Sequence, residues 1–264
     1  MTIFHDFVVK NVKKCNSSHI VMMKLDSKTQ FNKTLEYLKT KKRVLLLTTS
    51  NRWSGETHAK VPKSTALAYK MKELLNDKAN TEAAECAVTL IEVPLLNIHP
   101  CEGNVSTKQG NTCGLPKALL HDDAKNPSGL HRCWASINNP DDELWQISKE
   151  LFESDCVLFF GSIRWGQLNS YYQKLIERLT WIENRHSTLG EENVIENIDA
   201  GIITVGHNWH GLEAMETQKK VLGYFGFRIV DDLCWHWQFT DNALEESEGA
   251  YLDAAVEFEE KFLK

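Results

Sequence analysis

Short runs of hydrophobic residues alternate along the chain with longer segments in which hydrophobic residues recur at helical spacing. A short run without polar positions is typical of a strand buried on both faces of a parallel sheet, and helical spacing is typical of a helix with one buried face. The runs predict strands at Val44–Thr49, Ala87–Val93, Val157–Phe160, Ala200–Val205 and Phe227–Val230. The spaced segments predict helices at Ser64–Leu75, Asp141–Phe152, Leu168–Leu179, Leu212–Tyr224 and Ala250–Phe262. Such alternation predicts a mostly parallel, doubly wound sheet with right-handed crossovers.

Two segments lie outside this alternation. Residues 1–42 precede the first strand and are expected to form an N-terminal extension, so that residues 43–264 make up the main domain. Asn97–Pro140 is much longer than the usual connection in an α/β fold, and a connection of that length is typically functional, oligomeric or disordered. Its cysteines, its histidines and Trp134 argue against disorder. We therefore expect this excursion to cover the carboxyl edge of the sheet or to form a subunit interface.

The composition narrows the class of protein. A formal net charge of -6 and a pI near 5.9 argue against a nucleic-acid-binding surface, which would need a basic stripe. The sequence has no apolar run near the roughly 20 residues that span a bilayer, and its start lacks a basic segment followed by an apolar stretch. We therefore expect a cytoplasmic protein whose seven cysteines are mostly reduced.

Three loops are predicted to leave the carboxyl ends of strands, which meet at one edge of a parallel sheet and commonly form its ligand site. The first loop, Thr48–Thr65, is rich in hydroxyl groups and ends where a helix begins. The N–H groups and the partial positive charge at a helix N-terminus suit a phosphate. Ser50, Ser64 and Thr65 can donate hydrogen bonds to it, and Arg52 can add a charged pair of donors. The alternative is a capped helix with a polar lead-in.

The other two loops carry aromatic and polar side chains to the same edge. The second is a predicted turn at Gly161–Gln167, where Trp165 could cover a flat aromatic ligand or could simply close the end of the core. The third, Val205–Leu212, contains an indole, two imidazoles and an amide. His207 and His210 lie in a turn, without a carboxylate or thiolate at ligand spacing. They therefore favour polar contact with a ligand, or exposure to solvent, over metal binding.

Together the three loops resemble those of the NADPH-dependent FMN reductase family, which has the flavodoxin-like fold. Ser162-Ile-Arg-Trp-Gly-Gln167, with the aromatic-rich helix after it, is similar to the second flavin loop of that family. Gly206-His-Asn-Trp-His-Gly211 takes the place of its third loop, and the resemblance covers roughly residues 43–229. It implies a strand order of 2-1-3-4-5. It also implies that the first loop holds the FMN phosphate while the other two contact the isoalloxazine ring.

The resemblance assigns cofactor contacts to residues of all three loops. The phosphate would be held by Ser50, Arg52, Ser64 and Thr65, and the ring would lie against Ser162, Ile163, Arg164, Trp165, Gly166, Gln167, Gly206, His207 and Asn208. Arg164 and the turn amides would stabilise negative charge on the reduced ring. Trp165 and Trp209 would wall the ring or the place where nicotinamide and acceptor bind. No catalytic acid or base is identified, and no metal is expected.

The cysteines of the excursion raise a separate question. Related flavoproteins can carry an iron–sulfur cluster on a compact cysteine motif after the second strand, because one short loop must present its thiolates to one cluster. Cys101, Cys113 and Cys133 are spread too widely for that motif. Buried or incidental thiols are the favoured interpretation. A redox role for Cys101 or Cys133 is the alternative.

These observations lead us to expect an FMN-dependent NAD(P)H oxidoreductase that passes a hydride or electrons to a quinone, a flavin or a similar small acceptor. The cofactor would carry the chemistry, and the protein would place and tune it. Two alternatives stay open: an electron-transfer flavoprotein without direct NAD(P)H reactivity, and a flavin-free binding or regulatory protein on the same fold. We expect a homodimer or homotetramer without nucleic-acid or membrane partners.

Overall fold

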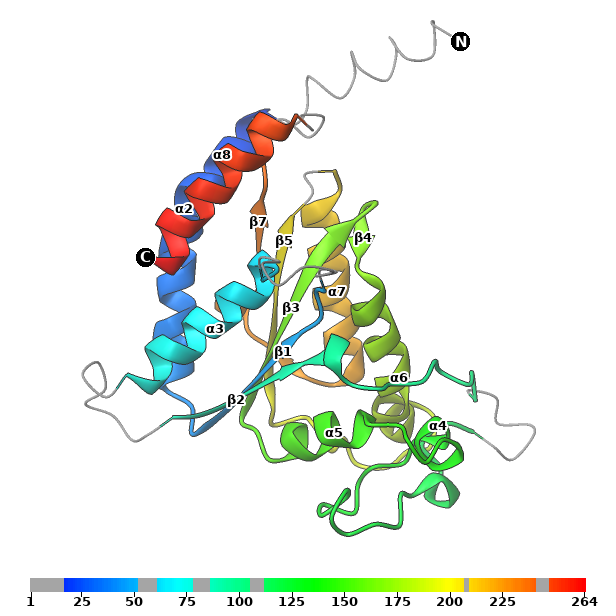
Figure 1. The fold of residues 1–264 in the computed structure, drawn as a ribbon. Coiled ribbons are helices and arrows are strands. Elements are labelled where there is room, and N and C mark those ends of the chain that lie inside the picture. Colours follow the sequence, from blue (N-terminus) through cyan, green and yellow to red (C-terminus); the bar gives the residue numbers. More distant parts are fainter. Residues whose placement is uncertain (1–16, 52–60, 78–85, 105–111, 207–208, 241–246) are drawn as a thin grey trace, which may run out of the picture.

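The computed structural model describes residues 17–51, 61–77, 86–104, 112–206, 209–240 and 247–264, with side chains from Ser27 onward. A seven-stranded sheet forms the centre of this part of the chain, with helices on both of its faces (Figure 1). Because both faces are covered, the central strands are almost continuously apolar. Arg52, His207 and Asn208, which the sequence assigned to the cofactor, lie outside the described residues.

Four parallel strands make up the middle of the sheet: β2 (Ala87–Glu92), β1 (Arg43–Thr48), β3 (Cys156–Arg164) and β5 (Asp199–Gly206). The principal strands follow the order β2-β1-β3-β5-β6. The short β4 (Gln167–Leu168) is only the return arm of a hairpin on β3. The predicted order 2-1-3-4-5 is therefore confirmed, with β5 and β6 as the fourth and fifth strands.

The fifth position in the sheet is divided between two short strands, where the sequence predicts one strand at Phe227–Val230. β6 (Arg228–Ile229) pairs with the start of β5, and β7 (Trp235–Gln238) pairs with its end. The 3-10 turn η4 (Asp231–Leu233) separates them. Sequence analysis missed β7 because its aromatic and polar residues alternate, whereas all four residues are buried in the structure.

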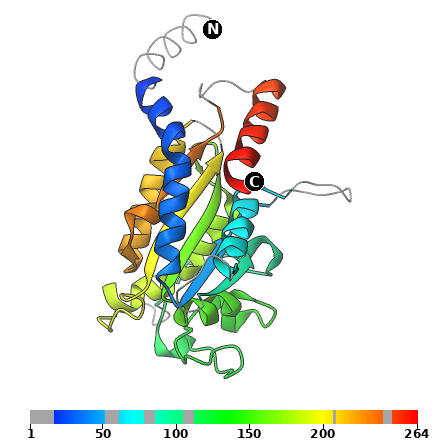
Figure 2. The same ribbon diagram turned by 90° about the vertical axis from the view of Figure 1, so that its left-hand side faces the viewer.

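Helices form a layer on each face of the sheet (Figures 1 and 2). One layer contains α2 (Ser17–Lys39), α3 (Lys63–Asn76) and α8 (Glu248–Phe258), which continues into the π-helical turn η5 (Glu259–Leu263). The other contains α5 (Leu144–Phe152), α6 (Ser170–Ser187) and α7 (Gly211–Phe225). None of the helices in the described ranges is both long enough and apolar enough to cross a membrane.

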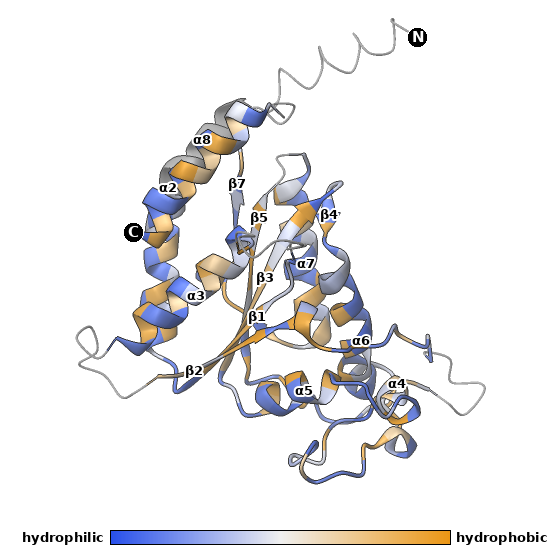
Figure 3. Cartoon of the chain, in the orientation of Figure 1, coloured by the Kyte–Doolittle hydropathy of each residue, from blue (hydrophilic) through white to orange (hydrophobic). Residues whose placement is uncertain are grey.

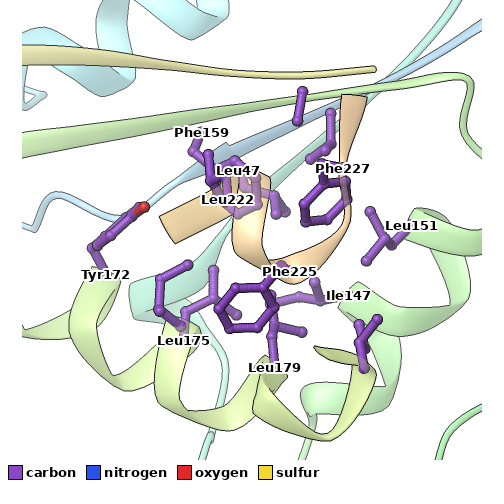
Figure 4. Close-up of a cluster of buried hydrophobic side chains, with 14 of the residues drawn as sticks. Leu47, Ile147, Leu151, Phe159, Tyr172, Leu175, Leu179, Leu222, Phe225 and Phe227 are labelled. Carbon is purple, nitrogen blue, oxygen red and sulfur yellow. The ribbon is translucent and has the colours of Figure 1, made fainter. Parts of the chain in front are cut away.

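Alternate residues of the strands supply two hydrophobic cores, one under each helical layer. Val157 and Phe159 of β3 belong to the core beneath α5, α6 and α7 (Figure 4), and Leu158 and Phe160 belong to the other. The helices accordingly carry both hydrophobic and hydrophilic residues (Figure 3), since only one side of each faces a core. This division follows from the two-residue period of a strand.

The described part of the predicted N-terminal extension contributes to one of these cores. The helix α2 buries Phe31, Leu35 and Leu38 in the core on the α3 side. Its C-terminal end is also bonded to the start of β5, where the Tyr37 hydroxyl donates to the Asp199 carboxylate (2.7 Å) and Lys41 pairs with the same group (2.5 Å). The division of the chain at residues 42 and 43 into extension and domain stays a prediction.

The described part of the excursion, which includes the short helix α4 (Trp134–Asn138), lies against α5 and the C-terminal half of α6 (Figure 1). Side chains of α6 donate to its carbonyl groups: Arg178 to His99 (2.6 Å) and Asn184 to Cys113 (2.6 Å). Because α6 starts at the carboxyl edge and runs back, its C-terminal half is remote from that edge. These residues therefore do not cover the edge as expected, and the alternative of a subunit interface stays a prediction.

A buried ion pair lies where the end of the excursion meets α6. Arg178 donates to both carboxylate oxygens of Asp142 (2.7 and 2.9 Å), and both side chains are fully buried. Ser136 completes the cluster, because its hydroxyl accepts from Arg178 (2.9 Å) and donates to Asp142 (2.8 Å). Burial alone would raise the pKa of Asp142, but the hydrogen bonds and charge of Arg178 hold it below its ordinary value.

Candidate functional site

Buried hydroxyl groups lie at the end of β1 and at the start of α3. Ser64 donates to Ser50 across the loop (2.7 Å), and both residues are buried. The hydroxyls of Thr65, in the first turn of α3, and Thr48, the last residue of β1, are also buried. Neither Thr48 Oγ1 nor Thr65 Oγ1 has a hydrogen-bond partner among the described residues. The structure thus brings Ser50, Ser64 and Thr65 together, as the sequence predicts.

The first turn of α3 has no side-chain cap. Its N-cap residue is Pro62, which has no side chain able to accept a hydrogen bond. The first amides of any α-helix lack acceptors inside the helix. Within the described residues, Thr48 Oγ1 and Thr65 Oγ1 thus lie without partners near the start of α3, and the N-terminus of a helix suits an anion. Residues 52–60 of the loop lie outside the described residues, so the alternative of a capped helix with a polar lead-in stays open.

The second loop differs from the turn predicted at Gly161–Gln167. Here β3 continues through Arg164 and returns as β4, so that only Trp165 and Gly166 form the turn. Gly161 is paired within the sheet rather than in a turn, opposite Thr204 of β5. A Cβ atom at Gly161 would lie 2.6 Å from Leu168 Cδ2. Glycine is needed here because Leu168 packs closely against the backbone. From the sequence alone, a glycine required by packing looks the same as a glycine required by a turn.

The tip of this hairpin projects an indole into solvent. Trp165 is 91% exposed and has a φ of 50°, and the following Gly166 has a φ of 70°. Two positive φ values in a two-residue loop match the type I′ hairpin, which favours asparagine and glycine. Trp165 therefore does not close the end of the core, which was one of its two interpretations. Arg164 and Gln167 are exposed on either side of it, while Ile163 is buried and Ser162 is partly buried.

Residues of the third loop pack against this hairpin. A Cβ atom at Gly166 would lie 2.9 Å from the Trp209 ring, so the indole rests against the turn backbone. Trp209 is 46% exposed, and its ring contacts the His210 ring edge-on at 4.5 Å. Gly206, opposite Ile163 in the sheet, has a φ of 134°. The described residues of all three loops therefore lie along neighbouring strands at one edge.

Asn169 joins the first and second loops, and sequence analysis did not identify it. Its amide nitrogen donates to the Thr49 carbonyl (2.6 Å), and its amide oxygen accepts from the Thr49 hydroxyl (3.0 Å). The same oxygen accepts from the Ser162 backbone amide (3.4 Å). Asn169 precedes α6, where asparagine usually caps a helix. That ordinary position concealed its role, since its side chain makes no cap here.

The ring of His236 packs against Gly211 at the start of α7. The sequence alone did not identify this residue either. Its ring lies 2.4 Å from the position that a Cβ atom of Gly211 would occupy, so only glycine fits there. Nδ1 is 2.8 Å from the Thr204 hydroxyl, while Nε2 has no partner among the described residues. Burial lowers the pKa of His236 to about 4, which keeps the imidazole neutral near pH 7.

The described residues contain no group of three or more histidines, cysteines or carboxylates placed to hold a metal ion. In the excursion, Cys133 accepts a hydrogen bond from Arg178 (3.4 Å), and Cys113 is buried. Burial, together with the neighbouring Cys133, raises the pKa of Cys113 to about 12. A thiol of this kind is inert near pH 7, in agreement with the favoured interpretation of buried thiols. Cys101 is only partly buried.

Solved structures share this architecture at low sequence identity. The structure of RosB with the bound intermediate 8-demethyl-8-formylriboflavin 5′-phosphate is 13% identical, with a TM-score of 0.50 over 82% of this chain and 73% of that one. Azoreductase AzrA (11% identity, TM-score 0.47, 84% and 97% coverage) is similar in part. So is a putative quinone reductase from Klebsiella pneumoniae (14% identity, TM-score 0.41, 83% of both chains).

No protein-family model matches the chain, and no curated protein sequence is similar to it. At identities this low, the structural comparisons establish the fold alone. The similarity to the RosB structure extends over 82% of this chain, and the sheet of this chain has the strand order β2-β1-β3-β5-β6. The protein thus has a flavodoxin-like α/β fold, with its candidate site at the carboxyl edge of the sheet.

Proposed function

We propose that the protein is an FMN-dependent NAD(P)H oxidoreductase that passes a hydride or electrons to a quinone, a flavin or a similar small acceptor. The observation that carries this proposal is the fully buried hydroxyl of Thr65 in the first turn of α3, which has no hydrogen-bond partner among the described residues. A buried hydroxyl without a partner costs free energy, on the order of 1–3 kcal/mol. A phosphate oxygen would supply the missing acceptor.

The surroundings of Thr65 support a phosphate rather than an uncharged ligand. Ser64, the neighbouring residue, donates to the Ser50 hydroxyl, and amides of the first turn of α3 would donate to the same anion. The partial positive charge of the helix N-terminus adds to this attraction. Thr48 Oγ1 is a second buried hydroxyl without a described partner at the same end of β1. Arg52 is proposed to contribute from the loop between them.

The neighbouring loops would hold the ring. Gly206 would let the backbone of β5 approach a flat ligand closely, because glycine has no side chain, and its φ of 134° is a conformation that favours glycine. Arg164, Gln167 and the turn amides would bind the polar edge of the ring, and Trp165 would cover it. When bound, FMN would accept a hydride from NAD(P)H and supply electrons to the acceptor. The flavin phosphate derivative in the RosB structure supports this choice of cofactor.

One isosteric substitution tests the phosphate site. Thr65→Val keeps the shape of the side chain and removes its hydroxyl. We expect it to weaken FMN roughly 10- to 100-fold, as is usual for a hydrogen bond to a charged group. Riboflavin, which lacks the phosphate, should bind the variant and the original protein equally. Thr217→Val, on the exposed side of α7, is the matched control.

Quenching of flavin fluorescence would give each affinity, and mass analysis of the bound ligand would identify the flavin. Equal losses for FMN and riboflavin would contradict the phosphate placement. If the protein bound neither FMN nor riboflavin, this result would contradict the cofactor assignment and favour the flavin-free alternative. FAD as the sole ligand would overturn the choice of FMN.

Turnover is tested separately from binding. We expect NADH or NADPH to bleach the FMN-loaded protein without oxygen, and a quinone to restore its absorbance. Because the hairpin and third loop would leave one open face of the ring, nicotinamide and acceptor should take turns there. Double-reciprocal rate plots should then be parallel. If neither nucleotide bleaches the flavin, the electron-transfer alternative is favoured. We also propose a cytoplasmic homodimer or homotetramer, which light scattering would detect.

A further inference from the structure

The excursion contains a cavity of about 360 Å³, remote from the carboxyl edge of the sheet. It lies between the segment around η3 (Pro116–Ala118), the end of α4 and the start of α5. Leu119, Leu120 and Ile137 form apolar walls, and the half-buried indole of Trp145 lies beside them. A cavity of this volume falls within the usual range for small-molecule sites, roughly 300–1,000 Å³.

Two lysines border the cavity without a matching carboxylate. Neither Lys117 nor Lys125 is within ion-pair distance of a carboxylate in the described part of the chain. In a cavity of similar volume beside α2, by contrast, Lys39 is paired with Glu36 (2.8 Å) and Lys70 with Glu73 (2.9 Å). Within the described residues, Lys117 and Lys125 therefore leave positive charge at the rim of the excursion's cavity.

The acidic groups around this cavity are already engaged. Asp142 lines it, but both of its oxygens are bonded to Arg178, so the pair adds no net charge. Asp122 lies nearby in the sequence, and its side chain accepts from the backbone amides of Ala124 and Lys125. Among the residues that line the cavity, Lys117 and Lys125 therefore carry positive charge that Asp142 does not offset, beside apolar walls.

The indole and one of the lysines lie close enough to act on a single ligand. Lys125 Nζ is 5.8 Å from the centroid of the Trp145 ring. An aromatic ring stacked on that indole would place a substituent carboxylate within reach of the ammonium group. We propose that this cavity binds a small aromatic carboxylate, with its rings against Trp145 and the apolar walls and its carboxylate between Lys117 and Lys125.

Two probes that differ only in charge test the proposal: 2-naphthoate and its neutral analogue 2-naphthamide. Titration calorimetry should show saturable binding of naphthoate, tighter than binding of naphthamide. The double variant Lys117→Gln/Lys125→Gln should weaken naphthoate about tenfold, through loss of two partly exposed charged contacts. Naphthamide should be unaffected by it. Trp145→Leu should weaken both probes, since both would stack on the indole.

The matched control is Lys149→Gln/Lys220→Gln, which removes the same charge from α5 and α7 outside the cavity and should leave both affinities unchanged. Each titration is repeated with saturating FMN, so the proposal stands apart from the proposed function. Unchanged naphthoate binding with FMN is expected. Displacement by FMN, absence of saturable naphthoate binding, or equal affinity in the original protein and all three variants would overturn the site.

Discussion

The Asn169 side chain forms two hydrogen bonds with Thr49. Its amide nitrogen donates to the Thr49 carbonyl at 2.6 Å, and its amide oxygen accepts from the Thr49 hydroxyl at 3.0 Å. The Thr49 hydroxyl is also 2.9 Å from the Phe160 carbonyl. One buried side chain thus joins the end of β1 to the residue before α6. The geometry of the candidate site depends on this connection, because the first and second loops leave from these two points.

We expect Asn169→Ala to destabilise the protein by about 2 kcal/mol, since it removes the hydrogen bonds of the Asn169 side chain and leaves the Thr49 carbonyl without the donor that Asn169 supplies. Urea unfolding would measure the loss. The variant should also bind FMN more weakly than the original protein, because both loops lose their common support. Asn32→Ala, on the exposed side of α2, is the control and should have little effect. Full stability of Asn169→Ala would contradict a structural role for this side chain.

Trp165 is expected to reduce stability in exchange for function. A bulky residue with a φ of 50° costs roughly 1–2 kcal/mol relative to one that tolerates this conformation. Trp165→Asn gives the Asn-Gly pair that type I′ hairpins prefer. It should therefore raise the free energy of unfolding by about 1 kcal/mol, while turnover with flat acceptors falls. Stability from urea unfolding and initial rates with a quinone would check both effects.

Trp165→Phe is the matched control for that experiment. It retains an aromatic ring and the strained backbone, so neither stability nor turnover should change much. If Trp165→Asn left turnover intact, the exposed indole would have no part in binding the ring or the acceptor.

Two glycines should respond oppositely to alanine. A Cβ atom at Gly211 would lie 2.4 Å from His236 Nε2, whereas one at Gly249 in α8 would meet nothing within 4 Å. Because the imidazole is buried, Gly211→Ala should cost about 1–3 kcal/mol through overpacking. Gly249→Ala should add about 0.5–1 kcal/mol, since alanine restricts the unfolded chain and favours a helix. Thermal unfolding of the two variants would test the contrast, and equal shifts would contradict it.

Stability should fall as the pH is lowered from about 6.5 toward 4. Burial lowers the pKa values of both His131 and His236 to about 4, and the charge of Arg178 adds to the effect on His131. The ordinary histidine pKa is about 6.5. Between these values the unfolded chain binds more protons than the folded protein. Each histidine should therefore cost about 1–2 kcal/mol between pH 7 and pH 5.

Urea unfolding at pH 7, 6 and 5 would measure this loss. His236→Gln should reduce the drop by about half, because one of the two buried imidazoles is removed. The lowered pKa values of Asp142 and Asp199 act only below about pH 4, where those carboxylates take up protons, so they do not enter this window. A free energy of unfolding that is the same at pH 5 and pH 7 would show that the imidazoles are not buried in neutral form.

The family resemblance implied the order of the principal strands, and the sequence pattern by itself determined the fold class and the edge at which the loops meet. The last two features follow from local patterns: a strand such as β1 is buried on both faces, so its residues are continuously apolar, and α3 has one buried face and shows it in its spacing. The clustering of Ser50, Ser64 and Thr65 follows as well, because loops after parallel strands leave from one edge.

Only the tertiary structure decided which residues support that edge. Asn169 contacts Thr49 across 120 positions of the chain, and His236 lies beneath Gly211 from a strand that alternates aromatic and polar residues. Gly161 is required by Leu168 rather than by a turn. Contacts of this kind depend on side chains from distant segments filling one another's space. A local pattern of hydrophobic and polar residues records that a position is buried, but it does not record what the position is buried against.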